Sequence, residues 1–423
     1  MHRQLAIVVA IGIFSHLVML ALIDPLIGGD SLYYIPAGRM IAEHGALDPR
    51  YYRPPGYPLF LALLFQISHH PAFVMAVQSC LTVGLAVLAL LRLQKPIGFS
   101  AALLIASSPF LIVFDYAVVS ESLLVALLVA AFLVRQPIVS GMLLGLAILT
   151  RDTLLLLPLF VIGFGLIDRS KLKHSLIVAL VACLVVLPWP ARNSLLPDGQ
   201  FTLSEGRFGL NLWIGTWERN GDWARRGVKK ADFPNYAFQN DRAEISQALQ
   251  TDNDRVFKRA AFKRIANDPW FVVSSWVARY PGLWLGSRVD WVRLRIKWDS
   301  LLWGILNVGL KCLNTLTLLA GLVGMVLAIR RRGELAYLSI PVIYIALIHI
   351  PFHNAEPRYS LPALAFLYVF AAYLLDNFYR RPAIRSGDGD AVVGFDGQTG
   401  FEIGASRDHE NRREHLNAGA GQT

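Results

Sequence analysis

Long apolar runs separated by short polar segments make up most of this 423-residue chain. A helix that crosses a bilayer needs about 20 predominantly apolar residues. The runs therefore predict an all-α polytopic membrane protein with about ten transmembrane helices. The expected spans cover about residues 5–23, 72–91, 97–114, 117–134, 138–149, 154–167, 176–189, 301–329, 335–352 and 361–378.

Two apolar runs near the N-terminus need separate interpretation. The run at 5–23 is longer than the apolar core of a signal peptide, and Asp24-Pro25 follows it without small residues at a cleavage position. We therefore expect an uncleaved first helix. The run at 58–67 is too short to span a bilayer, so we expect it to lie along the outer interface.

Basic residues between the expected spans set the orientation. Lysine and arginine collect in the cytoplasmic loops of membrane proteins, and here they follow the second, fourth, sixth and eighth spans. They are Arg92, Lys95, Arg135, Arg169, Lys171, Lys173 and the run Arg330-Arg331-Arg332. Both termini are therefore expected in the cytoplasm. A first loop at about 24–70 and a large, partly helical loop at about 190–300 are expected on the outer side.

Composition supports the membrane class. Hydrophobic residues make up 55% of the chain, charged residues 17%, and the mean hydropathy is +0.46, which is outside the range of ordinary soluble domains. The three cysteines lie inside apolar runs and predict buried apolar residues, not metal ligands. The net charge of +10 reflects membrane orientation, so we expect no nucleic-acid partner. We assign 1–379 to the membrane domain and 380–423 to a disordered cytoplasmic tail.

Asp30 is the main candidate for chemistry in the first outer loop. Gly28-Gly29 precedes it and Tyr33-Tyr34 follows, which gives the acid a flexible backbone and amphipathic rings at headgroup level. A carboxylate at this boundary can take a proton from a hydroxyl held within hydrogen-bond reach. The alternative interpretation is a solvated loop acid or a helix cap.

Further ionisable residues fall on the same side of the membrane, in outer connections or at the helix ends beside them. They are Arg53, Asp115, Glu121, Arg151, Asp152, Arg192, Glu356 and Arg358. Ionisable groups near helix ends are costly unless they are paired or functional. The alternative is that the acids only pair with Arg151 or Arg358 or are solvated, and that Arg358 is an interfacial anchor or pairs with Glu356.

A series of motifs, in this order, resembles those of the GT-C membrane glycosyltransferases. The motifs are Asp30 followed by Tyr33-Tyr34, Arg53-Pro54-Pro55-Gly56-Tyr57-Pro58-Leu59-Phe60, Ser120-Glu121-Ser122-Leu123, Thr150-Arg151, Ala191-Arg192-Asn193 and Glu356-Pro357-Arg358-Tyr359-Ser360-Leu361-Pro362. Their order is most similar to the bacterial Rgt-like lipopolysaccharide sugar transferases. The lipid A aminoarabinose transferases and the protein O-mannosyltransferases are more distant. The resemblance covers about residues 24–362.

This resemblance implies inverting transfer of a sugar from a polyprenyl-phosphate donor to a cell-envelope acceptor, which is lipopolysaccharide, another glycan or lipid, or a protein. It implies a bacterial inner membrane location with the active site on the periplasmic side. Asp30 matches the first-loop acid, the general base of the family. Arginine suits the developing charge on a phosphate leaving group, so Arg53, Arg192 and Arg358 are the expected donor-phosphate ligands. The expected supporting residues are Tyr33, Tyr34, Tyr57, Glu121, Asp152 and Glu356.

The first-loop motif departs from that of several GT-C members, which have two adjacent acids. Here Gly29 and Ser31 flank Asp30, so the motif does not support a divalent metal and we assign no metal ligand or other cofactor. The sequence also lacks a glycine motif that cradles nucleotide phosphates, which agrees with a lipid-linked donor.

Two other classes remain as alternatives. A multi-pass transporter or flippase of lipid-linked solutes also needs many spans, but it predicts ionisable residues near the midplane and an internal repeat. The mid-span polar residues are few, chiefly Gln78, Asn307, Lys311 and Asn314, and the sequence has no convincing repeat. A non-catalytic membrane scaffold would leave the clustered outer carboxylates without a purpose.

Overall fold

The computed structural model describes residues 1–48, 51, 53–195, 201, 208–217, 254–286, 293–294, 301–352 and 357–379. These residues belong to one compact unit, Met1–Arg380. Glu356 and the expected tail at 380–423 lie outside the described residues, so the predictions for them stay untested.

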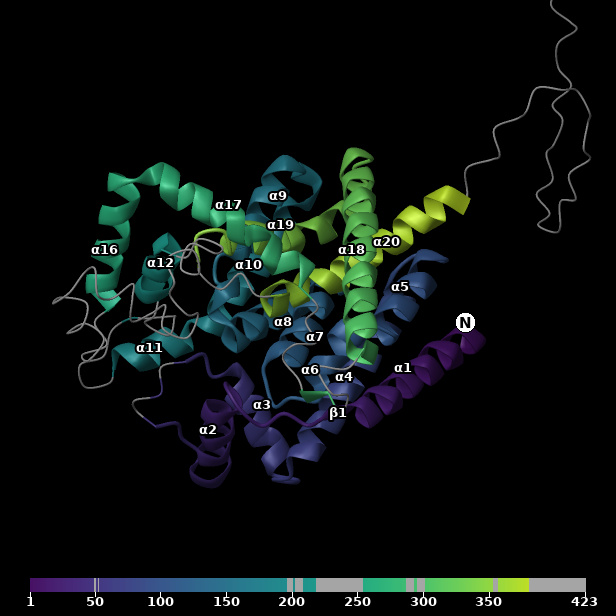
Figure 1. The fold of residues 1–423 in the computed structure, drawn as a ribbon, viewed down its shortest axis with the longest axis horizontal. Helices are drawn as coiled ribbons and strands as arrows, with labels where there is room; N and C mark the ends of the chain where they lie inside the picture. The colour runs from purple at the N-terminus through teal and green to yellow at the C-terminus, as the bar shows by residue number, and fades with distance from the viewer. Residues whose placement is uncertain are drawn as a thin grey trace, which may run out of the picture. The chain divides into compact units, whose positions relative to one another are not determined.

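The described chain is almost entirely helical (Figure 1). The α-helices are α1 His2–Leu22, α2 Ser31–His44, α3 Gly56–Phe65, α4 Pro71–Arg92, α5 Ile97–Ala106, α6 Pro109–Asp115, α7 Glu121–Leu133, α8 Pro137–Thr150, α9 Leu157–Ile167, α10 Leu172–Val186, α11 Pro188–Ser194, α12 Phe208–Trp217, α16 Asp254–Asn267, α17 Pro269–Leu285, α18 Leu301–Arg330, α19 Ser339–Ile348 and α20 Leu361–Tyr379. The short elements are η1 Asp152–Leu154, η2 Arg169–Lys171, η5 Glu334–Leu338, η6 Pro357–Ser360, β1 Ile23–Asp24 and β2 Arg293–Leu294.

Each expected span coincides with a helix or a pair of helices, and the described chain is that of a multi-pass membrane protein. Five helical segments of the described part are long and apolar enough to cross a membrane, or six if α5 and α6 form one broken span. Other apolar helices, α7, α8, α9 and α19 among them, are shorter than a full span. The expected number of about ten spans therefore stays a prediction.

The expected span at 97–114 is broken, and its sequence explains the break. The residue before a proline is pushed out of the α region, and Ser108 before Pro109 has an extended backbone. The Ser108 hydroxyl accepts a hydrogen bond from the Leu111 amide and so caps α6. α5 and α6 meet at an angle of 50°.

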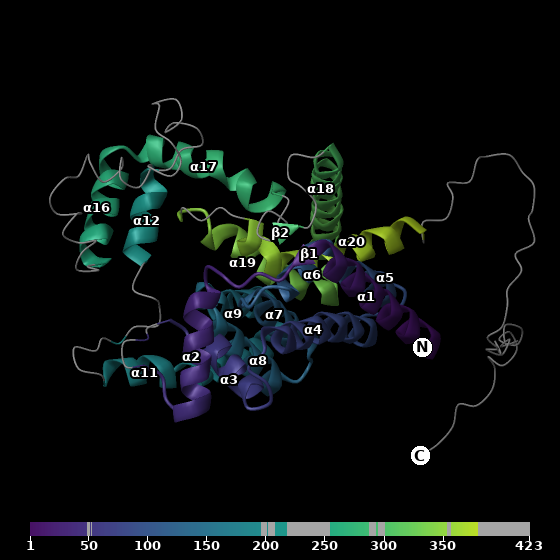
Figure 2. The same ribbon diagram turned by 60° about the horizontal axis from the view of Figure 1, so that its bottom comes forward.

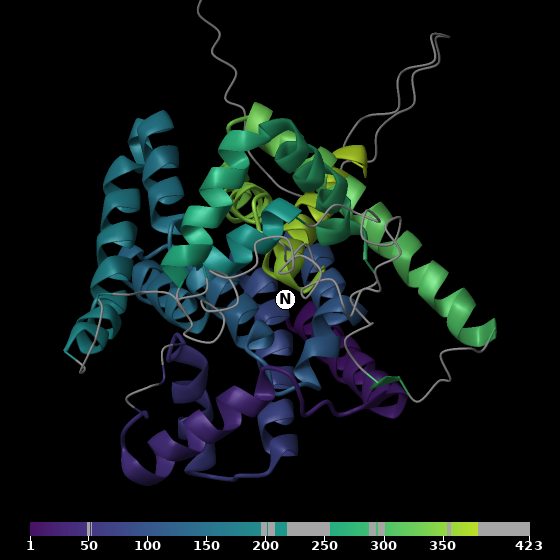
Figure 3. The same cartoon turned by 60° about the vertical axis from the view of Figure 1, so that its left-hand side comes forward.

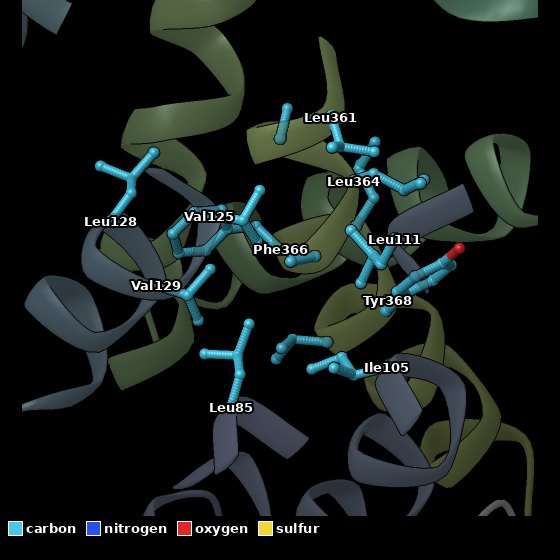
Figure 4. Packing of buried hydrophobic residues seen from close by; sticks show 14 of the residues in the cluster. Leu85, Ile105, Leu111, Val125, Leu128, Val129, Leu361, Leu364, Phe366 and Tyr368 are labelled. Atoms are coloured by element: carbon cyan, nitrogen blue, oxygen red, sulfur yellow. The ribbon is translucent and has the colours of Figure 1, made fainter. Parts of the chain in front are cut away.

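Among the long candidate spans of the described part, the one that contains α20 is the most buried, and α20 packs against α18, α5 and α7. Figure 4 shows Phe366 of α20 beside Val125 of α7, and Leu361, Leu364 and Val129 belong to the same cluster. Membrane helices associate through close packing and not through exclusion of water, and glycines allow it here. A Cβ atom on Gly324 of α18 would lie 2.0 Å from the carbonyl oxygen of Phe370 in α20.

Helices from the expected large outer loop form a smaller packed group. α12, α16 and α17 contact one another around Trp213 and Phe257, both fully buried (Figure 3). The guanidinium of Arg279 in α17 donates hydrogen bonds to the carbonyl oxygens of Gly215 and Phe352, which joins α17 to α12 and to the chain after α19. The expectation that this loop is partly helical is confirmed.

Two short pairings hold the chain that follows α1. β1 pairs antiparallel with β2, so that Ile23 faces Leu294 (Figure 2). Just after β1, Leu26 forms an isolated parallel bridge with Ala117, between α6 and α7. These contacts fix the path of the backbone that leads into α2.

Candidate functional site

Asp30 stands at the start of α2 because of the glycine before it. Gly29 has a φ of +57°, a left-handed conformation that glycine adopts without a steric penalty. The turn at Gly28-Gly29 ends the extended segment after β1, and α2 begins at Ser31. The carbonyl oxygen of Asp30 accepts from the amides of Tyr33 and Tyr34, while its side chain makes no capping bond. The carboxylate is therefore available for contacts outside its own helix.

Each oxygen of the Asp30 carboxylate accepts a hydrogen bond from a different arginine. Nη1 of Arg53 lies 3.3 Å from Oδ1, and Nη1 of Arg358 lies 3.1 Å from Oδ2. Arg53 precedes α3 and Arg358 belongs to η6, so three distant parts of the sequence meet at this point. The geometry brings together one predicted base and two predicted phosphate ligands.

A second ion pair lies beside the first. Glu121 is the first residue of α7, and its side chain is 2% exposed. Its Oε1 accepts from Nη1 of Arg151 at 2.9 Å and lies 4.0 Å from Nη1 of Arg358. Oε2 of Glu121 is buried and has no hydrogen-bond partner among the described residues. Arg358 therefore lies between the two carboxylates.

We call Asp30, Arg53, Glu121, Arg151 and Arg358 the arginine–carboxylate cluster. Three guanidinium groups face two carboxylates, so the cluster carries one net positive charge at neutral pH. Guanidinium groups bind phosphate through paired N–H donors. The cluster has the charge and the donors that an anionic group requires.

Tyr359 separates two of these arginines. The guanidinium of Arg151 lies 4.7 Å from the centre of its ring, and that of Arg358 lies 4.8 Å from it. Arg358 also donates to the Tyr359 hydroxyl at 2.8 Å. Cation–π contacts of this kind offset part of the repulsion between neighbouring guanidinium groups. Tyr359 thus allows two cations to stay close together.

His349 lies next to the cluster, beside Tyr359. Its ring packs against Tyr359 with centroids 5.3 Å apart. The His349 ring is buried, with 7% of the residue surface exposed. A cavity of about 10 Å³ lined in part by Arg151, His349 and Tyr359 lies here, with room for about one water molecule.

The pKa of Asp30 is set by two opposing effects. Burial raises the pKa of its carboxyl, but the charges of Arg358, Arg151 and Arg53 outweigh burial and hold the pKa below its ordinary value. Asp30 is therefore ionised at neutral pH. For Arg151, burial lowers the pKa, but the charge and hydrogen bond of Glu121 together with the effects of Tyr359 and Tyr34 raise it by more, so this guanidinium stays charged.

The three predicted supporting tyrosines surround the Asp30 end of the cluster. The guanidinium of Arg53 lies 4.0 Å from the ring centre of Tyr33 and 6.0 Å from that of Tyr34. Tyr34 packs edge-on against Tyr57 with centroids 5.0 Å apart. Tyr57 is fully buried, and its hydroxyl donates to Gln78 at 2.7 Å. Tyr33 and Tyr34 thus hold Arg53, while Tyr57 supports Tyr34 from behind.

The remaining predicted residues are placed differently. Arg192 of α11 donates to the carbonyl oxygens of Asp48 and Tyr51 at 3.0 and 3.1 Å, so it holds the first outer loop just before Arg53. Asp152 begins η1 directly after Arg151. Glu356 lies outside the described residues. The phosphate-binding role of Arg192 and the supporting roles of Asp152 and Glu356 stay predictions.

Tyr359 and His349 had no assigned role from sequence, and Arg151 was named only as a possible pairing partner of the outer acids, as it is for Glu121. Arg151 and Tyr359 lie within the motifs Thr150-Arg151 and Glu356–Pro362, which was the available signal. His349 follows the apolar run of α19 and carried no motif. Their roles depend on side-chain contacts between α7, α8, α19 and η6 that no local pattern shows.

Both carboxylates of the cluster are engaged by arginines. Asp30 and Glu121 already accept hydrogen bonds from guanidinium groups, which compete with a cation for the same oxygens. In the described part of the chain, no group of three or more histidine, cysteine, aspartate or glutamate side chains is arranged to hold a metal ion.

Comparison with known proteins supports the fold class. No protein-family model matches the sequence, and no curated protein matches it. In structure, the chain is similar to the archaeal oligosaccharyltransferase AglB from Archaeoglobus fulgidus, solved in complex with an inhibitory peptide and a dolichol-phosphate. The sequence identity is 14% and the TM-score 0.50, over 89% of this chain and 50% of the other, so the chain spans about half of AglB's length. At this identity the likeness shows the fold alone, and it agrees with the GT-C-like fold that the sequence motifs imply.

Proposed function

We propose that this protein is a glycosyltransferase that moves a sugar from a polyprenyl-phosphate donor to a cell-envelope acceptor on the outer side of the membrane. The observation that carries the proposal is the pairing of Asp30 with Arg53 and Arg358 inside a cluster of net positive charge. A base and a phosphate site must lie side by side for this reaction, and the cluster supplies both. The GT-C-like fold supports the same activity class.

Asp30 is the proposed general base. It takes the proton of the acceptor hydroxyl while that oxygen bonds to the anomeric carbon of the donor. The bond from the anomeric carbon to the phosphate oxygen breaks on the opposite side, and its electron pair stays with the polyprenyl phosphate. The configuration at the anomeric carbon is therefore inverted.

Donor binding activates this base in our proposal. A carboxylate held by two guanidinium groups is a weak base, because its negative charge is already stabilised. The donor phosphate competes with Asp30 for Arg53 and Arg358. Once the phosphate is bound, the carboxylate loses part of this stabilisation and its pKa rises. Proton transfer is thereby favoured only when donor is present.

The arginines stabilise the leaving group. Arg53 and Arg358 bind the phosphate oxygens directly, and Arg151 adds positive charge from behind Tyr359. Groups placed in advance at the position of developing charge contribute about 100-fold or more to the rate. Arg192 of α11 contacts the donor farther out, beside the backbone of Asp48 and Tyr51 that it holds.

The donor class follows from the same chemistry. AglB was solved with a dolichol-phosphate, which supports a lipid-phosphate donor for a chain of similar fold. We propose lipopolysaccharide, another glycan or lipid, or a protein as acceptor, and a bacterial inner membrane with both termini in the cytoplasm as the location. Divalent metal is not required by this mechanism.

A transporter or flippase of lipid-linked solutes is the second candidate. It is favoured by the buried ion pair of His16 and Asp115, with Nε2 and Oδ2 3.0 Å apart within the bundle, because transporters place ionisable groups inside the membrane. Such a protein moves the intact lipid-linked sugar and forms no glycosylated product. A transfer assay therefore separates the two functions.

The test compares Asp30→Asn with Glu43→Gln, both in reconstituted vesicles with a radiolabelled polyprenyl-phosphate sugar and an envelope extract as acceptor. Glu43 lies in α2, the helix that follows Asp30, but it is not part of the arginine–carboxylate cluster. Asp30→Asn is expected to lower kcat by about 100-fold or more, and Glu43→Gln to transfer at the normal rate. Normal transfer by folded Asp30→Asn would disprove the general-base role.

Orientation is tested by labelling single cysteines in a variant without the native ones. A cysteine at Leu195, which is exposed after α11, is expected to react with an impermeant maleimide from outside. A cysteine at Arg332 is expected to react only after the membrane is opened. The reverse pattern would place the cluster on the cytoplasmic side and contradict the proposed location.

A further inference from the structure

A buried polar network lies within the helix bundle and is separate from the arginine–carboxylate cluster. It consists of His16 of α1, Gln78 of α4 and Asp115 of α6, which are 7%, 0% and 0% exposed. Buried polar groups in a membrane protein are costly unless they are fully bonded, and they are usually retained for a function. The proposed mechanism does not use these three residues.

The hydrogen bonds of His16 determine how many protons the pair with Asp115 holds. Nδ1 of His16 lies 2.8 Å from the carbonyl oxygen of Gly12, so Nδ1 must carry a proton and donate it. Nε2 lies 3.0 Å from Oδ2 of Asp115, and this bond needs one more proton, on either atom. The pair is then neutral overall in both forms. A neutral pair is far less costly in the bilayer than an isolated charge.

Both the nitrogen and the oxygen of the Gln78 side-chain amide form hydrogen bonds. Its Nε2 donates to the carbonyl oxygens of Asp115 and Ala117 at 3.1 and 2.8 Å. Its Oε1 accepts from the hydroxyl of Tyr57. Gln78 therefore ties α4 both to the segment after α6 and to α3, and an apolar side chain of the same length cannot replace these bonds.

These contacts hold one particular segment of the backbone. Residues 115–117 are bonded to Gln78 through two carbonyl oxygens and to His16 through the Asp115 side chain. The Tyr116 hydroxyl donates to the carbonyl oxygen of His16 at 2.6 Å, and the Tyr116 carbonyl accepts from the Leu26 amide at 3.0 Å. The segment that follows α1 is thus held against the segment that follows α6.

The register of that contact places both carboxylates of the cluster. Leu26 and Ala117 form a parallel bridge, and the two chains then run in the same direction. Asp30 comes four residues after Leu26, and Glu121 comes four residues after Ala117. Each acid stands at the start of a helix, α2 or α7. A shift of one residue at the bridge would move Asp30 relative to Glu121.

We propose that His16, Gln78 and Asp115 are positioning residues that set the register of Asp30 against Glu121, and with it the fit of Arg358 between the two carboxylates. The structural part of the proposal is independent of the reaction, while its catalytic part rests on the proposed glycosyl transfer. The hydrogen bonds of the network involve none of the arginines of the cluster. Because the network holds the two acids in place, it acts on the chemical step and not on binding of the sugar donor.

The first test replaces Gln78 with leucine and compares it with Gln66→Leu. Gln66 donates a single exposed hydrogen bond to the carbonyl oxygen of Ala42 and is the matched control. Gln78→Leu is expected to lower kcat by about 100-fold with KM for the donor within about twofold, since a displacement of about 1 Å has an effect of that size. Gln66→Leu is expected to leave both constants unchanged.

Hydrogen–deuterium exchange measures the register without any assay of transfer. The Leu26 amide is protected by its bond to Tyr116, so the peptide that contains Leu26 is expected to exchange faster in Gln78→Leu but not in Gln66→Leu. Asp30→Asn is expected to lose transfer and keep this protection. Normal protection of Leu26 in Gln78→Leu, or faster exchange with unchanged kcat, contradicts the positioning role.

A second test uses the neutral pair. His16→Ala leaves the Asp115 carboxyl without its partner, and the swapped variant His16→Asp with Asp115→His restores a pair that shares one proton. We expect at least about tenfold recovery of kcat in the swap relative to His16→Ala, a coupling typical of contacting residues. A swap no better than the single variant overturns the role of the pair. Wild-type protein without transfer refutes the proposed function alone, and the exchange result still decides the register.

Discussion

Nη1 of Arg358 lies 3.1 Å from Oδ2 of Asp30, although 328 residues separate the two in sequence. The contact joins the start of α2 to η6, the turn that leads into α20. Because α20 packs against α18, α5 and α7, the backbone at Arg358 is held near Asp30. The pairing is therefore a preformed feature of the site, made before any donor binds.

Replacing Arg358 with glutamine is expected to lower kcat/KM for the sugar donor by about 100-fold or more, because a guanidinium group that binds the leaving phosphate is lost. Arg358→Lys keeps the charge but not the planar fork, so we expect only partial recovery. Arg331→Gln is the control, since Arg331 is an exposed residue directly after α18 whose side chain bonds to Tyr373 and Asn377 of α20. Steady-state transfer rates at several donor concentrations measure all three.

The pH dependence of transfer is expected to report the environment of Asp30. The arginines hold the pKa of Asp30 below its ordinary value, so the acid limb of kcat/KM in the wild type lies below about pH 4. Arg358→Gln removes one of the neighbouring positive charges and moves this limb to higher pH. An acid limb at the same pH in both proteins would mean that another group titrates.

The same shift has a defined effect on stability. The folded-state pKa of Asp30 is depressed, so its ion pairs stabilise the protein above the ordinary pKa of a carboxyl group. This contribution is lost as the pH falls through the folded pKa. Thermal unfolding of the wild type and Arg358→Gln at pH 7 and at low pH is expected to show a difference at pH 7 that shrinks in acid.

Breaking the pair of Glu121 and Arg151 is expected to destabilise the fold more than removing both partners. Their side chains are 2% and 15% exposed, and loss of one partner leaves a buried charge uncompensated, which costs about 3–5 kcal/mol. Glu121→Gln and Arg151→Gln are each expected to lower the melting temperature in detergent, and the double variant to be more stable than the sum of the two losses predicts. Additive losses would show that the two groups do not interact.

The helices themselves were predictable because each apolar run carries its own signal. Their breaks were partly predictable: Pro109 inside the expected span at 97–114 is the residue that bends it by 50°. The number of full spans was not predictable, because α7, α8 and α9 are too short to cross a bilayer and their length does not say how they are arranged. The apolar pattern of a sequence shows which residues avoid water, not how deep in the bilayer a helix lies.

The candidate site was predictable as a set of residue types and not as a set of contacts. Topology and motif order placed Asp30, Arg53 and Arg358 on one side of the membrane, and the structure brings these three together. The contact of Arg192 with the carbonyl oxygens of Asp48 and Tyr51 depends on how the first loop folds back, for which the sequence has no local signal. The pairing of Arg151 with Glu121 corresponds to the alternative interpretation of the sequence, in which the outer acids pair with Arg151 or Arg358.

The close approach of α18 to α20 yields a last prediction. A Cβ atom on Gly324 would lie 2.0 Å from the carbonyl oxygen of Phe370, and backbone cannot move aside as a side chain does. Gly324→Val is therefore expected to separate the helices, at a cost of about 1–3 kcal/mol, and to displace Arg358 at the head of α20. Gly309→Val is the matched control in the same helix, because nothing lies within 4 Å of its added Cβ atom. We expect Gly324→Val to lower both the melting temperature and the transfer rate, and Gly309→Val to change neither. Equal losses in the two variants would show that α18 tolerates no β-branched residue and would remove the link between this helix contact and the placement of Arg358.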